Sequence, residues 1–206
     1  MRLSRLQRGW HKHSRHLRRK LEFGQDPRIF CLSCSDSRVC VHNIFSLRED
    51  GNIFEAKNVG GLFSEDAKAA FTYAVNNLDP DFFIVLHHTQ CGGYNSLESY
   101  ETEPEIKRHM VEYGGSHAKY KVEAFLKEKK LKLPDEHFRR LVIEEGCRIQ
   151  VETLRNFLLL HYPGKYEDLK SGKFRILPLV YDIKSGRVYR VPEELEGSET
   201  MDRKEP

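Results

Sequence analysis

Two short apolar runs, each followed by residues that can bind a metal, constrain this chain more than any other feature. The first run covers residues 29–32 and leads to Cys34, and the second covers residues 82–86 and leads to His88 and Cys91. Uninterrupted apolar runs of this length are typical of strands buried on both faces of a parallel sheet. The carboxyl ends of such strands lie at the sheet edge where α/β proteins build their sites. We therefore expect these three side chains to lie at that edge.

The segments around these runs alternate between strand and helix patterns. We expect strands at residues 28–33, 53–56 and 82–87, and again at 174–177 and 179–183 before a hairpin turn at 184–186. Helices are expected at 38–46, from Ser64 to Pro80, and over much of 94–161, where Asp135 is a candidate cap for a long helix. The alternation predicts an α/β fold with a mainly parallel central sheet flanked by helices.

Length and charge set the domain organisation that we expect. The 206 residues predict a single domain spanning 1–206, with no run apolar enough for a transmembrane helix. Residues 1–20 carry eight basic and no acidic residues, so the net charge of +3 leaves −5 for the remainder, which argues against nucleic-acid binding by the body. We expect residues 1–24 to form a basic N-terminal helical arm and residues 193–206 to form a mobile acidic tail.

The N-terminal arm and the cysteines bear on the cellular compartment. The apolar residues of the arm fall near one helical stripe, which predicts packing on the body or on a second subunit. An arginine-rich start without acids is also typical of an organelle transit peptide. Five cysteines with no signal peptide before them do not indicate a disulfide framework, so we expect a reducing, cytoplasmic location, or an organelle if residues 1–20 are a transit peptide.

Two thiolates and one imidazole form a ligand set that suits Zn²⁺. Three protein ligands, Cys34, His88 and Cys91, would leave the fourth tetrahedral position to water, which is the catalytic pattern. Cys31 offers an alternative, because it forms a C-x-x-C with Cys34 and could close a four-ligand structural site or a redox pair. Positions three apart in a strand point to opposite faces, which argues against both alternatives.

Asp36 and Arg38 follow the first cysteine at spacings that suit a second layer around the metal. Zinc lowers the pKa of bound water to about 7, and a nearby carboxylate can then orient the resulting nucleophile. The bidentate guanidinium of Arg38 could hold Asp36 in place for this role. An ordinary surface ion pair at a helix start is the alternative interpretation.

The pattern C-S-D-S-R at 34–38 followed by H-T-Q-C-G-G at 88–93 resembles the β-class carbonic anhydrases, and the similarity extends from about residue 25 to residue 191. This resemblance implies a zinc enzyme that hydrates carbon dioxide reversibly to bicarbonate and a proton, a carbonate dehydratase. It implies that Asp36 and Arg38 are catalytic, and that Asp36 becomes a fourth zinc ligand only in a closed state. It also implies a homodimer or a higher homo-oligomer.

The resemblance further assigns residues to a substrate pocket for carbon dioxide and bicarbonate. Gln25 matches a glutamine that reaches the site of a neighbouring subunit, and Phe54, Val59 and Tyr73 match the apolar wall. An apolar wall suits carbon dioxide, which has no charge or strong dipole. Gly92, directly after Cys91, exposes a backbone N–H that could approach bicarbonate.

Three departures from the family pattern are visible. His87 replaces a glycine and could relay protons or only pack, while Cys31 and Lys57 replace residues that bind an inhibitory bicarbonate in one subset of the family. We therefore expect an open zinc site at neutral pH. The alternative functions are hydrolysis of COS or CS₂ by the same zinc chemistry, and a zinc-stabilised interaction module without catalysis.

Overall fold

The structure is a computed structural model that describes residues 19, 21–47, 51–98 and 104–195. The predicted N-terminal arm and acidic tail therefore lie mostly outside the described residues. The strands are β1 (Ile29–Cys34), β2 (Ile53–Asn58), β3 (Phe82–His88), β4 (Arg175–Asp182) and β5 (Arg187–Arg190). The helices and helical turns are α3 (Val41–Ile44), η1 (Val59–Gly61), α4 (Glu65–Tyr73), η2 (Ala74–Leu78), α5 (Gly92–Asn95), η3 (Ser96–Glu98), α6 (Pro104–Glu112), α7 (Gly115–Lys129), α8 (Asp135–His161) and α9 (Pro163–Lys170).

The five strands form one sheet in the order β2-β1-β3-β4-β5. The first four are mutually parallel and only β5 is antiparallel, so the predicted α/β fold with a mainly parallel sheet is confirmed. The chain leaves β1 towards β2 on one side, and β3 lies on the other side of β1. A change of direction of this kind is where open α/β sheets place their sites.

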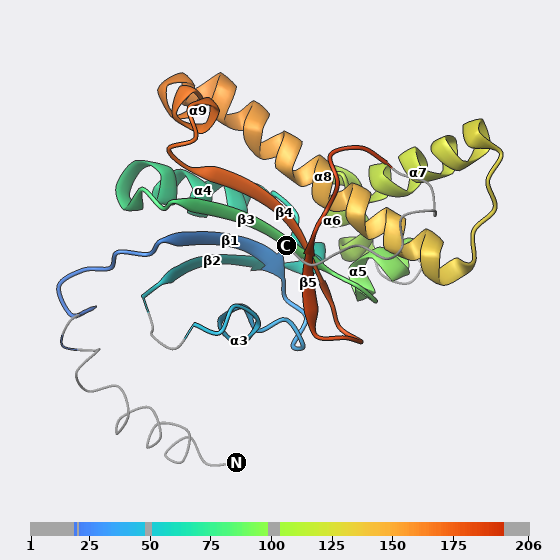
Figure 1. The fold of residues 1–206 in the computed structure, drawn as a ribbon, viewed down its shortest axis with the longest axis horizontal. Helices are drawn as coiled ribbons and strands as arrows, with labels where there is room; N and C mark the ends of the chain where they lie inside the picture. The colour runs from blue at the N-terminus through green and yellow to red at the C-terminus, as the bar shows by residue number, and fades with distance from the viewer. Residues whose placement is uncertain (1–18, 20, 48–50, 99–103, 196–206) are drawn as a thin grey trace, which may run out of the picture.

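The two faces of the sheet are covered unequally. One face packs against α4 and α8 in a core rich in aromatic rings, and α8 is the longest helix of the described residues with 27 residues. The other face holds a smaller cluster around Cys31, with Val39 and Val41 from the segment at α3. Figure 1 shows α8 above the strands and α3 below them.

Local signals explain several element boundaries. The Ser64 side chain accepts from the backbone N–H of Ala67 and caps α4, which has two acids in its first turn. The predicted helix at 38–46 shortens to Val41–Ile44.

The two segments expected as strand after residue 173 form a single strand through Pro178, whose carbonyl accepts from the Val191 N–H. Proline has no backbone N–H, and at position 178 this group would point towards β5. The pairing of β4 with β5 begins only at Leu179, so Pro178 removes no hydrogen bond between the two strands.

Candidate metal centre

The carboxyl ends of β1 and β3 bring the predicted metal ligands together. The two strands are hydrogen-bonded neighbours, Cys34 is the last residue of β1, and His88 is the last residue of β3. A tight turn follows β3, in which Gln90 has a φ of 57°, and it returns Cys91 to the same edge. Each ligand position is thus set by a strand end or by the turn directly after it.

The three ligand atoms form a compact, buried cluster. The Cys34 and Cys91 sulfurs are 3.8 Å apart, and all three ligand atoms lie within 4.8 Å of one another. Two thiolates bound to one tetrahedral zinc ion at about 2.3 Å are expected to lie roughly 3.8 Å apart. The buried Nε2 of His88 has no hydrogen-bond partner among the described residues, which suits an atom that donates its lone pair to a metal. These residues fit a Zn²⁺ ion.

The orientation of His88 is fixed by its other ring nitrogen. Nδ1 lies 2.9 Å from the carbonyl oxygen of Thr89, and because a carbonyl only accepts, Nδ1 carries the proton. The Thr89 hydroxyl donates to Asp182 at 3.0 Å and accepts from the backbone N–H of Ile183 at 3.0 Å. Strand β4 therefore holds the carbonyl that turns Nε2 of His88 towards the cysteines.

Cys34 lies in surroundings that favour its thiolate. The Cys91 thiol donates to the Cys34 sulfur and lowers the pKa of Cys34, and the nearby His88 ring and the backbone N–H groups of Asp36 and Gly60 lower it further. Burial opposes this shift without reversing it. The same hydrogen bond raises the pKa of Cys91, which holds the shared proton. A metal ion would displace that proton and bind two thiolates.

Cys31 does not join the cluster. It is fully buried on the face that packs against α3, and burial raises the pKa of its thiol above its ordinary value. Among the described residues the one group of potential metal ligands is Cys34, His88 and Cys91. The four-ligand alternative through Cys31 is therefore not supported by this geometry.

Asp36 and Arg38 form a bidentate pair next to the cluster. Arg38 donates from Nε to Oδ1 of Asp36 at 2.9 Å and from Nη2 to Oδ2 at 2.7 Å, and its backbone N–H also reaches Oδ1. The same Nη2 donates to the carbonyl of Gln90 at 3.2 Å, which ties the pair to the turn before Cys91. Hydrogen bonding by Arg38 holds the pKa of Asp36 well below its usual range, so the carboxylate stays ionised. Oδ2 of Asp36 lies 3.8 Å from Nε2 of His88.

The predicted pocket residues separate into two groups. Val59 directly follows Asn58, the register partner of Cys34, and Gly92 directly follows Cys91, so both lie beside the cluster. Phe54 and Tyr73 stack on each other with ring centroids 5.6 Å apart, but Phe54 is paired with Phe30. That register position is four residues, or about 13 Å, before Cys34 along the strands.

Gln25 lies still further from the metal centre of its own chain. It belongs to the segment that leads into β1, and its side chain is exposed. Tyr73 is 47% exposed although it is a large aromatic residue. The structure thus does not bring Gln25, Phe54 and Tyr73 to the cluster of the same chain. They lie towards the opposite end of the sheet.

His87 packs in the core. It is 1% exposed, and its ring nitrogens lie 3.2 Å from the carbonyl oxygens of Ile143 and Gly61. Burial lowers the pKa of His87 to about 4. The geometry therefore favours packing over the proton relay that the sequence left open.

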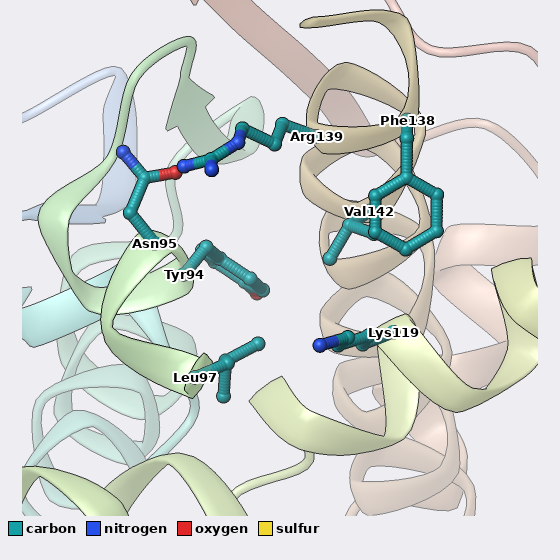
Figure 2. A pocket seen from close by; sticks show the side chains of 7 residues that line it. All are labelled: Tyr94, Asn95, Leu97, Lys119, Phe138, Arg139 and Val142. Carbon is teal, nitrogen blue, oxygen red and sulfur yellow. The ribbon is translucent and has the colours of Figure 1, made fainter. Parts of the chain in front are cut away.

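Tyr94 separates His87 from a small hollow between α5, α7 and α8. Its ring lies 5.5 Å from that of His87, and its hydroxyl rests on the bare backbone of Gly146, where a Cβ atom would come within 2.1 Å of the oxygen. Figure 2 shows the hollow, whose volume of about 20 Å³ suits one or two waters. It is lined by Tyr94, Asn95, Leu97, Lys119, Phe138, Arg139 and Val142, and not by the metal cluster.

Comparison with known proteins identifies similar chains and folds. The sequence model of the carbonic anhydrase family matches residues 29–188. Mitochondrial β carbonic anhydrase 6 of Arabidopsis thaliana is 25% identical over 175 residues, which are 79% of this chain and 56% of that protein. A carbonic anhydrase of Synechocystis is 27% identical over 205 residues, which are 90% of this chain and 67% of that protein. The chain thus spans little more than half the length of the Arabidopsis relative.

Solved structures agree on the fold. The β-carbonic anhydrase CcaA superposes with a TM-score of 0.76 at 25% identity, covering 90% of this chain and 82% of that chain. A structure from a study of two tetrameric β-carbonic anhydrases of Sordaria macrospora superposes with a TM-score of 0.74 at 20% identity, covering 91% and 92%. None of the helices in the described residues combines the length and apolar character needed to cross a bilayer.

Proposed function

The chain belongs to the β-class carbonic anhydrase family, and from this premise we propose that it catalyses the reversible hydration of carbon dioxide to bicarbonate and a proton. The observation that carries the proposal is the buried cluster of two sulfurs and one unprotonated imidazole nitrogen beside an ionised carboxylate. Cys34, His88 and Cys91 would hold Zn²⁺. Bound there with one open position, zinc would lower the pKa of a water ligand to about 7.

The roles of the remaining residues follow from their positions. Asp36 accepts the hydrogen bond of the attacking water and so aims its lone pair at the substrate carbon. Arg38 keeps that carboxylate ionised and holds it beside the cluster through its two hydrogen bonds. This arrangement supports the open form of the site. Val59 supplies an apolar wall, and Gly92 is exposed beside Cys91, where its backbone N–H can donate to the departing anion.

We also propose a homo-oligomer in which the site is completed by a second chain. Gln25, Phe54 and Tyr73 lie too far from the cluster of their own chain to line its pocket, and Tyr73 is half-exposed. A neighbouring copy would place these residues at the metal centre. The Sordaria relatives, described as tetrameric, support an assembly of this kind. The compartment stays a prediction, since the similarity includes a mitochondrial relative.

A stopped-flow assay of carbon dioxide hydration on the purified zinc-loaded protein tests the proposal. We expect hydration well above the buffer rate in the wild type, and the buffer rate in a Cys34→Ser variant. COS and CS₂ are offered to the same preparation. Turnover of these substrates without hydration of carbon dioxide would reassign the enzyme, and a zinc-loaded protein inactive on all three would contradict catalysis.

A further inference from the structure

The Asp36–Arg38 pair lies on a tight turn, residues 36–39, which is closed by its own backbone. The Val39 N–H donates to the Asp36 carbonyl at 2.9 Å, and the Arg38 N–H donates to Oδ1 of Asp36 at 2.9 Å. The side chain of Val39 is 2% exposed and packs in the apolar cluster around Cys31. Burial of this side chain keeps the turn close to the sheet.

Strand β2 holds the same turn through Lys57. Its register partner is Ser33, which lies two residues after Cys31, and side chains two apart in a strand share a face. Lys57 therefore points to the face of the sheet on which Val39 packs. Its Nζ donates to the carbonyl oxygen of Val39 at 2.7 Å, so a side chain of β2 is bonded to the backbone of the turn.

The two attachments fix different properties of the turn. Burial of the Val39 side chain is non-directional, so it sets how close the turn lies to the sheet but not how its peptide groups are rotated. A hydrogen bond from an ammonium group to a carbonyl is directional and charge-assisted, and such bonds are shorter and stronger than neutral ones. Lys57 therefore sets the orientation of the Val39–Cys40 peptide, which lies directly after Arg38.

This orientation matters because Arg38 donates to acceptors in two different parts of the chain. Its Nη2 donates to Oδ2 of Asp36 at 2.7 Å and to the carbonyl of Gln90, in the turn before Cys91, at 3.2 Å. The bond to Gln90 is at the upper end of the usual range of lengths. A rotation of the 36–39 turn would therefore break it first and release the guanidinium from the edge that carries the metal cluster.

We propose that Lys57 is a positioning residue for the Asp36–Arg38 pair, which acts through the carbonyl of Val39 to keep Arg38 on both of its acceptors. The inference rests on the proposed function, in which Asp36 orients the attacking water, and it adds a residue of β2 to that arrangement. Partners one layer outside the reacting groups contribute about 10- to 100-fold to activity. Because burial of Val39 also holds the turn, we expect the lower end of that range.

Lys57 can be replaced without disturbing the core, because it is exposed in the described part of the chain. Lys57→Met keeps the length of the side chain and removes the donor, whereas Lys57→Arg keeps a cationic donor of similar reach. Lys165→Met is the matched control. It also removes a lysine donor, to Asp79, which precedes β3 and so lies at the edge of the sheet away from the metal cluster.

Two measurements on the zinc-loaded proteins test the role of Lys57. Hydrogen exchange of the peptides that cover residues 35–40 is followed by mass spectrometry, and kcat and KM for carbon dioxide hydration are determined on the same samples. In K57M we expect faster exchange in this segment and a kcat about tenfold lower, with KM and zinc content within about twofold of the wild type. In K57R and K165M we expect exchange of this segment and kcat to stay within about twofold of the wild type.

Three results would overturn the inference: unchanged exchange at 35–40 in K57M, an unchanged kcat in spite of faster exchange, or K57R as impaired as K57M in both measurements, since the cationic donor would then not matter. The exchange measurement does not use carbon dioxide. A zinc-loaded wild type that does not hydrate carbon dioxide overturns the proposed function, and whether Lys57 holds the turn is then decided by the exchange of K57M alone.

Discussion

Cys31 and Cys34 lie on the same strand, both are buried, and their surroundings differ in the supply of hydrogen-bond donors. Cys34 faces the Cys91 thiol, His88 and two backbone N–H groups, and its pKa falls. Cys31 lies among apolar side chains such as Val39 and Leu86, with Glu55 nearby, and its pKa rises. Burial alone therefore does not set the pKa of a cysteine thiol in this strand. The groups that strand ends and turns direct at the sulfur of Cys34 outweigh its burial, and Cys31 has no such groups among the described residues.

Of the changes that test this comparison of the two cysteines, replacement of Cys34 itself should have the largest effect on zinc binding and activity. Cys34→Ser replaces a soft thiolate by a hydroxyl that stays protonated at neutral pH, so zinc content and hydration activity should both fall to background. Metal analysis after gel filtration and the stopped-flow assay measure the two losses. A variant that retains one zinc per chain and its activity would show that the sulfur of Cys34 is not a ligand.

The carboxylate beside the ligands should have the next largest effect. Asp36→Asn keeps the size of the side chain but removes the charge that Arg38 holds, so kcat should fall about 100-fold while zinc content stays at the wild-type level. The activity assay and metal analysis on the same sample separate these outcomes. Equal kcat in the two proteins would make the Asp36–Arg38 pair a surface ion pair only.

Cys31 offers the counterpart on the other face of the sheet. Cys31→Ala deletes one buried sulfur from a packed apolar cluster, so the free energy of unfolding should fall by about 1–2 kcal/mol. Zinc content and kcat should remain within about twofold of the wild type. Urea denaturation gives the stability change, and a loss of zinc in this variant would erase the contrast between the two cysteines.

The smallest effect is expected at Asp182, which supports His88 through Thr89. Burial alone would raise the pKa of Asp182, but hydrogen bonds from Ser185 and Thr89 outweigh it and lower the pKa. A lowered pKa adds stability above the unfolded value of about 3.9, and this stability is lost as the pH falls below it. Asp182→Asn should therefore cost about 1 kcal/mol at pH 7 and less below pH 4.

Urea unfolding of both proteins at pH 7 and pH 3.5 measures this difference. Chelator is present throughout, so that release of metal does not contribute to the pH dependence. The gap between the wild type and the variant should narrow at the lower pH. A gap of constant size would mean that the Asp182 carboxylate contributes nothing through its charge.

The metal cluster could be predicted from the sequence because a local pattern, an apolar run that ends at the residue, places Cys34 and His88 at strand ends. Cys34 ends one apolar run, His88 ends another, and parallel strands bring such ends to one edge. The same reasoning predicted the strand at 82–87 to within one residue, and Ser64 as the start of a helix. Asp36 and Arg38 meet because two residues separate them, a distance that one loop can close.

The supporting residues could not be predicted in this way. Thr89 and Asp182 are 93 positions apart, and only the pairing of β3 with β4 brings them together. Lys57 reaches the carbonyl of Val39 across 18 positions, and only the pairing of β1 with β2 brings it to the face on which Val39 packs. The position of Phe54 also depends on register: the resemblance to the family assigns it to a pocket wall, but pairing with Phe30 places it several residues before the cluster of its own chain.

The contact between Tyr94 and Gly146 has a mechanical consequence for the loop that carries Cys91. Tyr94 follows Cys91 by three residues, and Gly146 lies near the middle of a helix of 27 residues. Since even one methyl group at position 146 would collide with the tyrosine oxygen, the spacing between this helix and the sulfur-bearing turn is fixed by an absent side chain. Because these atoms are in direct contact, a small tilt of α8 at Gly146 would displace Tyr94 and with it the turn that carries Cys91.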